Sequence, residues 1–149
     1  MMRFMTEIEK GNANIVQQQL LSGNVKANQN WMGIYPLVMA VEQADIDIVV
    51  ILLTAGADIT LKPKDLGKQG RNALELATEM RDDPKGKFRE KAAAIVKVLS
   101  DQKACEKHFE ELQERLEATR QRDKKRALIF ITLVLPVLAA FLYLKFVSK

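Results

Sequence analysis

An internal repeat is the feature that most restricts how this chain can fold. Residues 15–23 align with residues 48–56 at an offset of 33 residues, and a shorter third copy lies at 95–99. A second motif at 33–40 matches 70–77 at an offset of 37 residues. Periods of 20–50 residues are typical of proteins built by stacking one small unit on the next. The repeat therefore predicts three stacked units in roughly the first 100 residues.

The composition of the repeated segments indicates that each unit is helical. Residues 48–53 are apolar around most of a helical circumference, as expected for a helix that packs on both sides. Gly23 and Gly56 follow these helices, at the position where a left-handed cap residue is favoured. Residues 17–19 are all Gln and would give the first unit a polar outer face. We therefore predict an all-α fold, an α-solenoid of three repeats.

These segments resemble the ankyrin repeat. Residues 48–58 (IVVILLTAGAD) are similar to the second helix and closing turn of that family, and Gly33 with Pro36-Leu37 and Ala40 is similar to its opening. The resemblance covers about residues 3–100 and implies an ankyrin-type solenoid. It also implies that partners bind at the hairpin tips and at the exposed side of each first helix.

The resemblance therefore supplies a set of candidate partner-binding residues. At the first tip they are Asn30, Trp31, Met32 and Ile34; at the second, Leu61, Lys62, Lys64, Gln69 and Arg71; and on the first helices, Glu42, Gln43, Glu79 and Met80. Trp31 beside Met32 is typical of an interface hot spot. The alternative is that Trp31 packs against the adjacent hairpin.

Residues 101–126 predict a connecting helix. From about residue 87 to residue 126 there is no Gly or Pro, so we expect the last repeat helix to run without a break into the C-terminal segment. A heptad seam runs along it: Ile95, Val98, Gln102, Cys105, Phe109, Leu112, Leu116 and Thr119. We expect a partner subunit to cover this seam, in preference to folding back on the repeats or to homodimerisation.

Residues 127–147 are almost entirely apolar and predict a single transmembrane helix. A helix of 18–21 residues spans roughly 27–31 Å, close to the hydrocarbon thickness of a bilayer. The basic residues within 120–126 would hold the N-terminal region on the cytosolic or matrix side, and could also bind anionic lipid. The arrangement resembles a tail-anchored protein, with a mitochondrial membrane favoured over the endoplasmic reticulum.

Charge and residue counts exclude several classes of function. Residues 1–119 carry 16 basic and 18 acidic side chains, so the net charge of +4 comes from the C-terminal end, and no nucleic-acid partner is expected. One Cys and one His exclude a disulfide framework and a Cys/His zinc site. Cys105 and His108 lie three residues apart, but Cys105 also fits an apolar seam position. We predict no catalytic residues, metal or cofactor.

The sequence thus predicts a non-catalytic, membrane-anchored module for binding proteins. Its favoured role is an accessory subunit of a larger membrane complex, with a mitochondrial complex preferred. The alternative is a tail-anchored adaptor or targeting factor that recruits a soluble client to the mitochondrial outer membrane or the endoplasmic reticulum.

Overall fold

The computed structural model describes residues 2–65 and 68–134. The chain divides into two compact units, Met1–Leu112 and Gln113–Lys149. The regular secondary structure of the described residues is helical apart from one short hairpin, which confirms the predicted all-α class.

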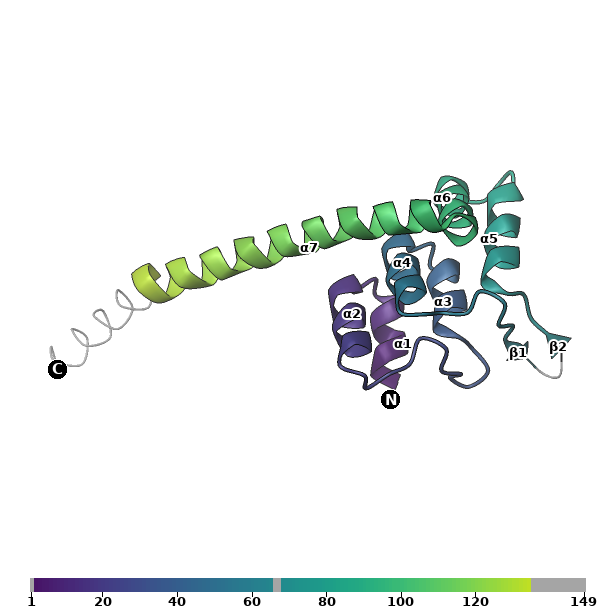
Figure 1. Ribbon diagram of the computed structural model, residues 1–149, viewed down its shortest axis with the longest axis horizontal. Helices are drawn as coiled ribbons and strands as arrows, with labels where there is room; N and C mark the ends of the chain where they lie inside the picture. Colours follow the sequence, from purple (N-terminus) through teal and green to yellow (C-terminus); the bar gives the residue numbers. More distant parts are fainter. Residues whose placement is uncertain (1, 66–67, 135–149) are drawn as a thin grey trace, which may run out of the picture. The chain divides into compact units, whose positions relative to one another are not determined.

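Three helical pairs make up most of the first unit (Figure 1). They are α1 (Met2–Glu9) with α2 (Ala13–Leu21), α3 (Pro36–Glu42) with α4 (Ile46–Thr54), and α5 (Ala73–Asp82) with α6 (Arg89–Ser100). The first helices pack in one row, α1 on α3 and α3 on α5, and the second helices in another, α2 on α4 and α4 on α6. The hairpin of β1 (Lys64–Asp65) and β2 (Lys68–Gln69) lies between the second pair and the third. We call the row α1–α3–α5 the inner row.

The turns of the first two pairs repeat with the sequence period. Gly11 and Ala44, 33 residues apart, both have positive φ, at 71° and 51°, and each lies between the two helices of its pair. Gly23 and Gly56 follow α2 and α4 with φ of 72° and 82°, which confirms the predicted left-handed caps.

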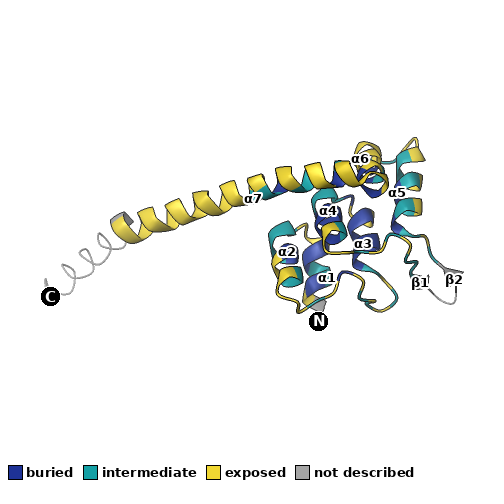
Figure 2. Ribbon diagram, viewed as in Figure 1, coloured by how far each residue is buried: buried dark blue, intermediate teal, exposed yellow. Residues whose placement is uncertain are grey.

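The core is centred on α4. Ile48, Val49, Val50 and Leu52 are fully buried and Ile51 is 2% exposed, because α4 packs against α3 on one side and against α2 and α6 on the others (Figure 2). An apolar pattern around the whole helix is what such a position requires. The predicted packing of this helix on both sides is therefore confirmed.

The predicted continuous helix is wrong, because it breaks at Asp101. Helix α6 ends at Ser100 and α7 (Gln102–Ile129) begins two residues later, with Asp101 extended at φ −130° and ψ 108°. The Asp101 carboxylate accepts a hydrogen bond from the backbone N–H of Lys103 at 3.0 Å. Asp is favoured at the start of a helix for this reason, and this bond offers the backbone an alternative to continuing the helix.

The predicted transmembrane helix is not supported either. Of the expected span 127–147, residues 135–147 lie outside the described part of the chain. Residues 127–129 form the end of α7, and Phe130–Val134 form a π-helical turn that follows it. Among described residues, no helix combines the length and the apolar character needed to cross a bilayer, since α7 is strongly charged along most of its 28 residues. This finding overturns the predictions of a tail anchor and of a single-pass location in a mitochondrial or reticular membrane.

The cap at Asp45 provides a test of the fold. Its carboxylate accepts a hydrogen bond from the backbone N–H of Ile48 at 3.1 Å, and burial raises its pKa. We expect Asp45→Ala to lower the free energy of unfolding by about 1 kcal/mol at neutral pH, because the cap is lost. Asp45→Asn keeps the acceptor and removes the cost of burying a charge.

The Asn variant should therefore be more stable than the wild type at neutral pH. Because the raised pKa makes the wild type gain stability as its carboxyl is protonated, this difference should shrink as the pH falls through the Asp45 pKa. Urea denaturation at several pH values measures both effects. A loss of stability at pH 7 as large for Asn as for Ala would contradict this account.

Candidate interaction surface

The first hairpin tip is a tight turn closed by two backbone bonds. Trp31 N–H donates to the carbonyl of Ile34 at 2.8 Å, and Ile34 N–H donates to the carbonyl of Trp31 at 3.0 Å. Met32 and Gly33 between them have φ of 53° and 93°, the positive values of a type I′ turn. The Asn30 side chain accepts a bond from Gly33 N–H at 2.8 Å and fixes the turn from outside.

Met32 is an unfavourable residue for this turn. A type I′ turn prefers Asn-Gly, and a methionine with positive φ strains the backbone. The Met32 side chain is also 93% exposed, so no packing offsets the strain. Strained residues of this kind cluster at functional sites. Met32 is therefore the feature of the tip that the fold alone does not explain.

Trp31 packs on α1. The indole is half-buried, with its ring centroid 6.5 Å from that of Phe4 and the two planes tilted by 37°. Its Nε1 is shielded from solvent and has no hydrogen-bond acceptor among the described residues. The Trp31 side chain is thus held by packing alone, and its contact with Phe4 is with a helix of the first pair.

An apolar groove lies beside this indole. Its volume is about 270 Å³, and it is lined by Met5, Thr6 and Glu9 of α1, by Trp31, Met32 and Ile34 of the tip, and by Met39 of α3. Methionine side chains are flexible and polarisable, so they adapt to differently shaped apolar partners. We refer to this cavity as the Trp31 groove.

Two basic side chains of the second tip form ion pairs with glutamates of α5. Lys62 Nζ lies 2.7 Å from Glu75 Oε1, and Arg71 pairs with Glu79. A close approach also closes the tip: Gly70 N–H donates to the Pro63 carbonyl at 2.7 Å, and a Cβ at residue 70 would lie 2.7 Å from Pro63 Cγ. The hairpin pairs the backbones of Lys64 and Gln69, but their side chains lie outside the described part of the structure. Leu61 is half-buried.

The inner row carries the remaining candidates between the two tips. Glu42 and Gln43 are exposed and Met80 is half-buried. A second cavity of about 320 Å³ is lined by Val38, Glu42, Pro63, Gly70, Arg71 and Leu76. Partial burial raises the pKa of Glu42, since its neighbours displace water from the carboxylate.

Four residues of the Trp31 groove were missed by the sequence analysis. Met5, Thr6, Glu9 and Met39 line this groove, but none belongs to the predicted set. The repeat offsets contain the missing signal, because Glu9, Glu42 and Glu79 are separated by 33 and 37 residues, the same offsets that relate the repeats. The three glutamates therefore occupy equivalent positions in α1, α3 and α5.

The helix seam is covered by the chain itself over part of its length. Cys105 is 7% and Leu112 2% exposed within the first unit, and Phe109 is half-buried. His108 Nε2 lies 3.0 Å from Asp47 Oδ1, which links α7 to the first turn of α4. The expectation that a partner covers this seam is therefore wrong for residues 105–112. Leu116 belongs to the second unit and is half-buried.

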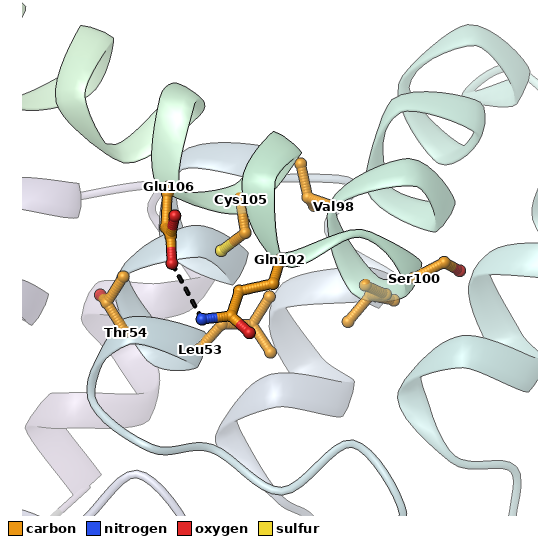
Figure 3. Close-up of a pocket in the computed structure, with 8 residues that line it drawn as sticks. Leu53, Thr54, Val98, Ser100, Gln102, Cys105 and Glu106 are labelled. Atoms are coloured by element: carbon orange, nitrogen blue, oxygen red, sulfur yellow. Dashed lines mark hydrogen bonds between the residues drawn. The ribbon is translucent and has the colours of Figure 1, made fainter.

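A larger pocket of about 530 Å³ lies next to Cys105 (Figure 3). Leu53 and Thr54 of α4 line it with residues of α6 and α7, and Gln102 Nε2 donates to Glu106 Oε1 at 2.9 Å across it. Burial, and secondarily the Glu106 charge, raises the pKa of the Cys105 thiol, so the thiolate needed for nucleophilic chemistry is disfavoured. No group of three His, Cys, Asp or Glu within the described ranges could hold a metal ion.

No family model, no curated protein and no solved structure matches this chain. This result overturns the assignment to the ankyrin-repeat family. The physical reason is that the quoted motifs follow from local structure. A helix that packs on both sides needs apolar residues around its circumference, and the turn after it needs a residue in the left-handed conformation. Any stack of short helical pairs meets those requirements, so the motifs predict the helices and turns without defining a family.

Met32→Asn tests whether the tip is strained. Asn tolerates positive φ better than Met and gives the Asn-Gly pair that a type I′ turn prefers, while the exposed Met side chain contributes no packing. We expect the free energy of unfolding to rise by about 0.5–1 kcal/mol. Thermal denaturation would show this as a melting temperature a few degrees higher.

Met32→Leu serves as the control. It keeps a β-carbon and an apolar side chain, so it should leave stability unchanged. An Asn variant no more stable than the Leu variant would show that the turn is not strained.

Proposed function

We propose that this protein is a non-catalytic protein-interaction module, and that it acts as a subunit of a larger assembly. In this proposal the helical pairs form a short α-solenoid whose inner row and first tip hold a segment of another protein. The observation that carries it is Met32, an apolar side chain that is 93% exposed on a strained turn beside the Trp31 groove.

The dimensions of the groove favour a protein partner over a small molecule. Pockets for small ligands measure roughly 300–1,000 Å³ and enclose most of the ligand. The Trp31 groove measures about 270 Å³, and Met32 and Ile34 at its rim are themselves exposed. Such a groove suits one or two side chains that project from a larger surface, as in interface hot spots.

Exposed apolar residues favour a lasting assembly over transient recruitment. Met32 and Ile34 would return to water each time a transient partner left, which costs free energy for every apolar side chain exposed. The second unit adds a run of four exposed apolar residues, Leu128–Ile131. A permanent neighbour would cover such surfaces.

Site-specific photo-crosslinking in cells tests the proposed function. A benzophenone amino acid is placed in the full-length chain at Met32 or, as the matched control, at Leu21, which is apolar and 80% exposed on α2. We expect the Met32 probe to label one defined protein and the Leu21 probe to label none. Equal labelling from both positions would refute the proposed surface.

Native electrophoresis of gently lysed cells separates the two possible roles. A permanent subunit should migrate with the protein labelled from Met32 even when no light is applied. Migration only as a small free species would contradict the subunit role and leave transient recruitment as the explanation of the crosslink.

A further inference from the structure

The inner row carries a ladder of acidic side chains next to its apolar grooves. Glu9, Glu42 and Glu79 occupy equivalent positions on three neighbouring helices, and all three are exposed. Glu79 is paired with Arg71. Glu9 and Glu42 form no ion pair among the residues that the structure describes.

Each of the two unpaired glutamates belongs to a groove. Glu9 is the one charged side chain that lines the Trp31 groove; the rest of the lining is apolar except for Thr6. Glu42 lines the neighbouring cavity, where Arg71 is already paired with Glu79. The surface thus offers an apolar groove with one unpaired carboxylate in its lining and a second unpaired carboxylate on the next helix of the inner row, and a binding segment would have to complement this charge pattern.

We propose that the occupant of this surface is an amphipathic segment of another protein, with an apolar side chain seated in the Trp31 groove and Lys or Arg side chains on Glu9 and Glu42. This inference specifies the partner of the proposed function and rests on it. The Met5, Met32 and Met39 side chains supply the adaptable apolar contact, and the two carboxylates set the sign of the partner's charge.

Helix geometry makes the proposal more specific. Helices α1 and α3 are packed together, and packed helices lie roughly 8–10 Å apart, so we expect a similar separation between Glu9 and Glu42, which occupy equivalent positions on them. Two basic residues seven positions apart on a bound helix are about 10.5 Å apart on the same face. A helix with an apolar anchor between two such basic residues would contact both glutamates at once, a helix-in-groove mode of recognition.

Partners that carry negative charge are disfavoured by the same two carboxylates. An acidic or phosphorylated segment would place like charges against Glu9 and Glu42, and nucleic acid would do the same with its phosphates. Neither carboxylate has a basic partner among the described residues to relieve that repulsion.

Peptide binding to the full-length chain tests the inference. The probe is a 15-residue helical peptide of Leu, Ala and Lys, with Leu between Lys residues seven positions apart. One comparison peptide replaces every Lys with Glu, and another replaces every Leu with Ser. Because Trp31 is the chain's only tryptophan and lines the groove, its fluorescence reports binding at this site, and peptide anisotropy gives the affinity.

We expect the Leu/Lys peptide to shift Trp31 emission and to bind at least tenfold more tightly than either comparison peptide. Glu9→Gln combined with Glu42→Gln should weaken its binding about five- to tenfold, as expected for the loss of two exposed ion pairs. The matched control is Glu90→Gln with Glu110→Gln, which changes the net charge equally at exposed positions of α6 and α7. The control should leave the affinity unchanged.

Two results would overturn the inference: equal affinity for the Lys and Glu peptides, or equal effects of the two double variants. Sequencing the segment that crosslinks to the probe at position 32 distinguishes a failure of this inference from a failure of the proposed function. A crosslinked segment without basic residues would leave the interaction module in place and refute the acidic ladder's role. The absence of any crosslink would refute the module itself.

Discussion

Burial of α4 on all sides is the constraint on which the rest of the structure depends. Five consecutive residues, Ile48–Leu52, are almost completely removed from water. Burying an apolar side chain of this size is worth roughly 1.5–3 kcal/mol, so no isolated helical pair could leave these residues exposed and remain folded. The pairs on either side therefore have to stack on α3 and α4. That stacking places α1, α3 and α5 in one row, and the grooves, the first tip and the acidic ladder are all consequences of that row.

The first tip shows where the chain departs from what stability alone would select. Nearly every other local feature agrees with the fold: left-handed glycines follow α2 and α4, Asp45 caps α4, and Asn72 with Glu75 forms a capping box on α5. Met32 does not agree, because it places an apolar side chain in water on a strained turn. Ala44 also has positive φ, at 51°, but it is buried, so of these two residues Met32 is the one that combines a strained backbone with an apolar side chain in water. A position that conflicts in this way with the rest of the fold is expected at a functional site. The proposed function rests on that conflict.

Sequence analysis anticipated the parts of the structure that follow from periodic, local chemistry. The apolar pattern of 48–53 predicted a helix packed on both sides, and Gly23 and Gly56 predicted the turns that follow two of the helices. Both predictions succeeded because burial and backbone conformation at these positions restrict which residue types can stand there. The break at Asp101 was missed because one aspartate in a run of helix formers looks like a solvated helix residue until its bond to Lys103 is seen.

The candidate site was anticipated only in part, for a related reason. Trp31 and Met32 were identified from the first tip, whereas Met5 and Glu9 were missed because the candidates on the first helices were taken from the second and third repeats alone. The opposite error arose at Cys105 and Leu112, where an apolar seam was assigned to a partner although the first unit itself covers those residues. Sequence pattern shows that a face must be covered, but only the three-dimensional packing shows what covers it.

Hydrogen exchange of the full-length chain, with and without the partner captured at Met32, tests the central claim most directly. If the inner row and first tip form the interaction surface, binding should slow amide exchange in α1, in residues 30–35 and in α3, and leave α2 and the first turns of α7 unchanged. Slower exchange confined to α2, α4 and α6 would contradict the account, because the partner would then lie on the opposite row of helices.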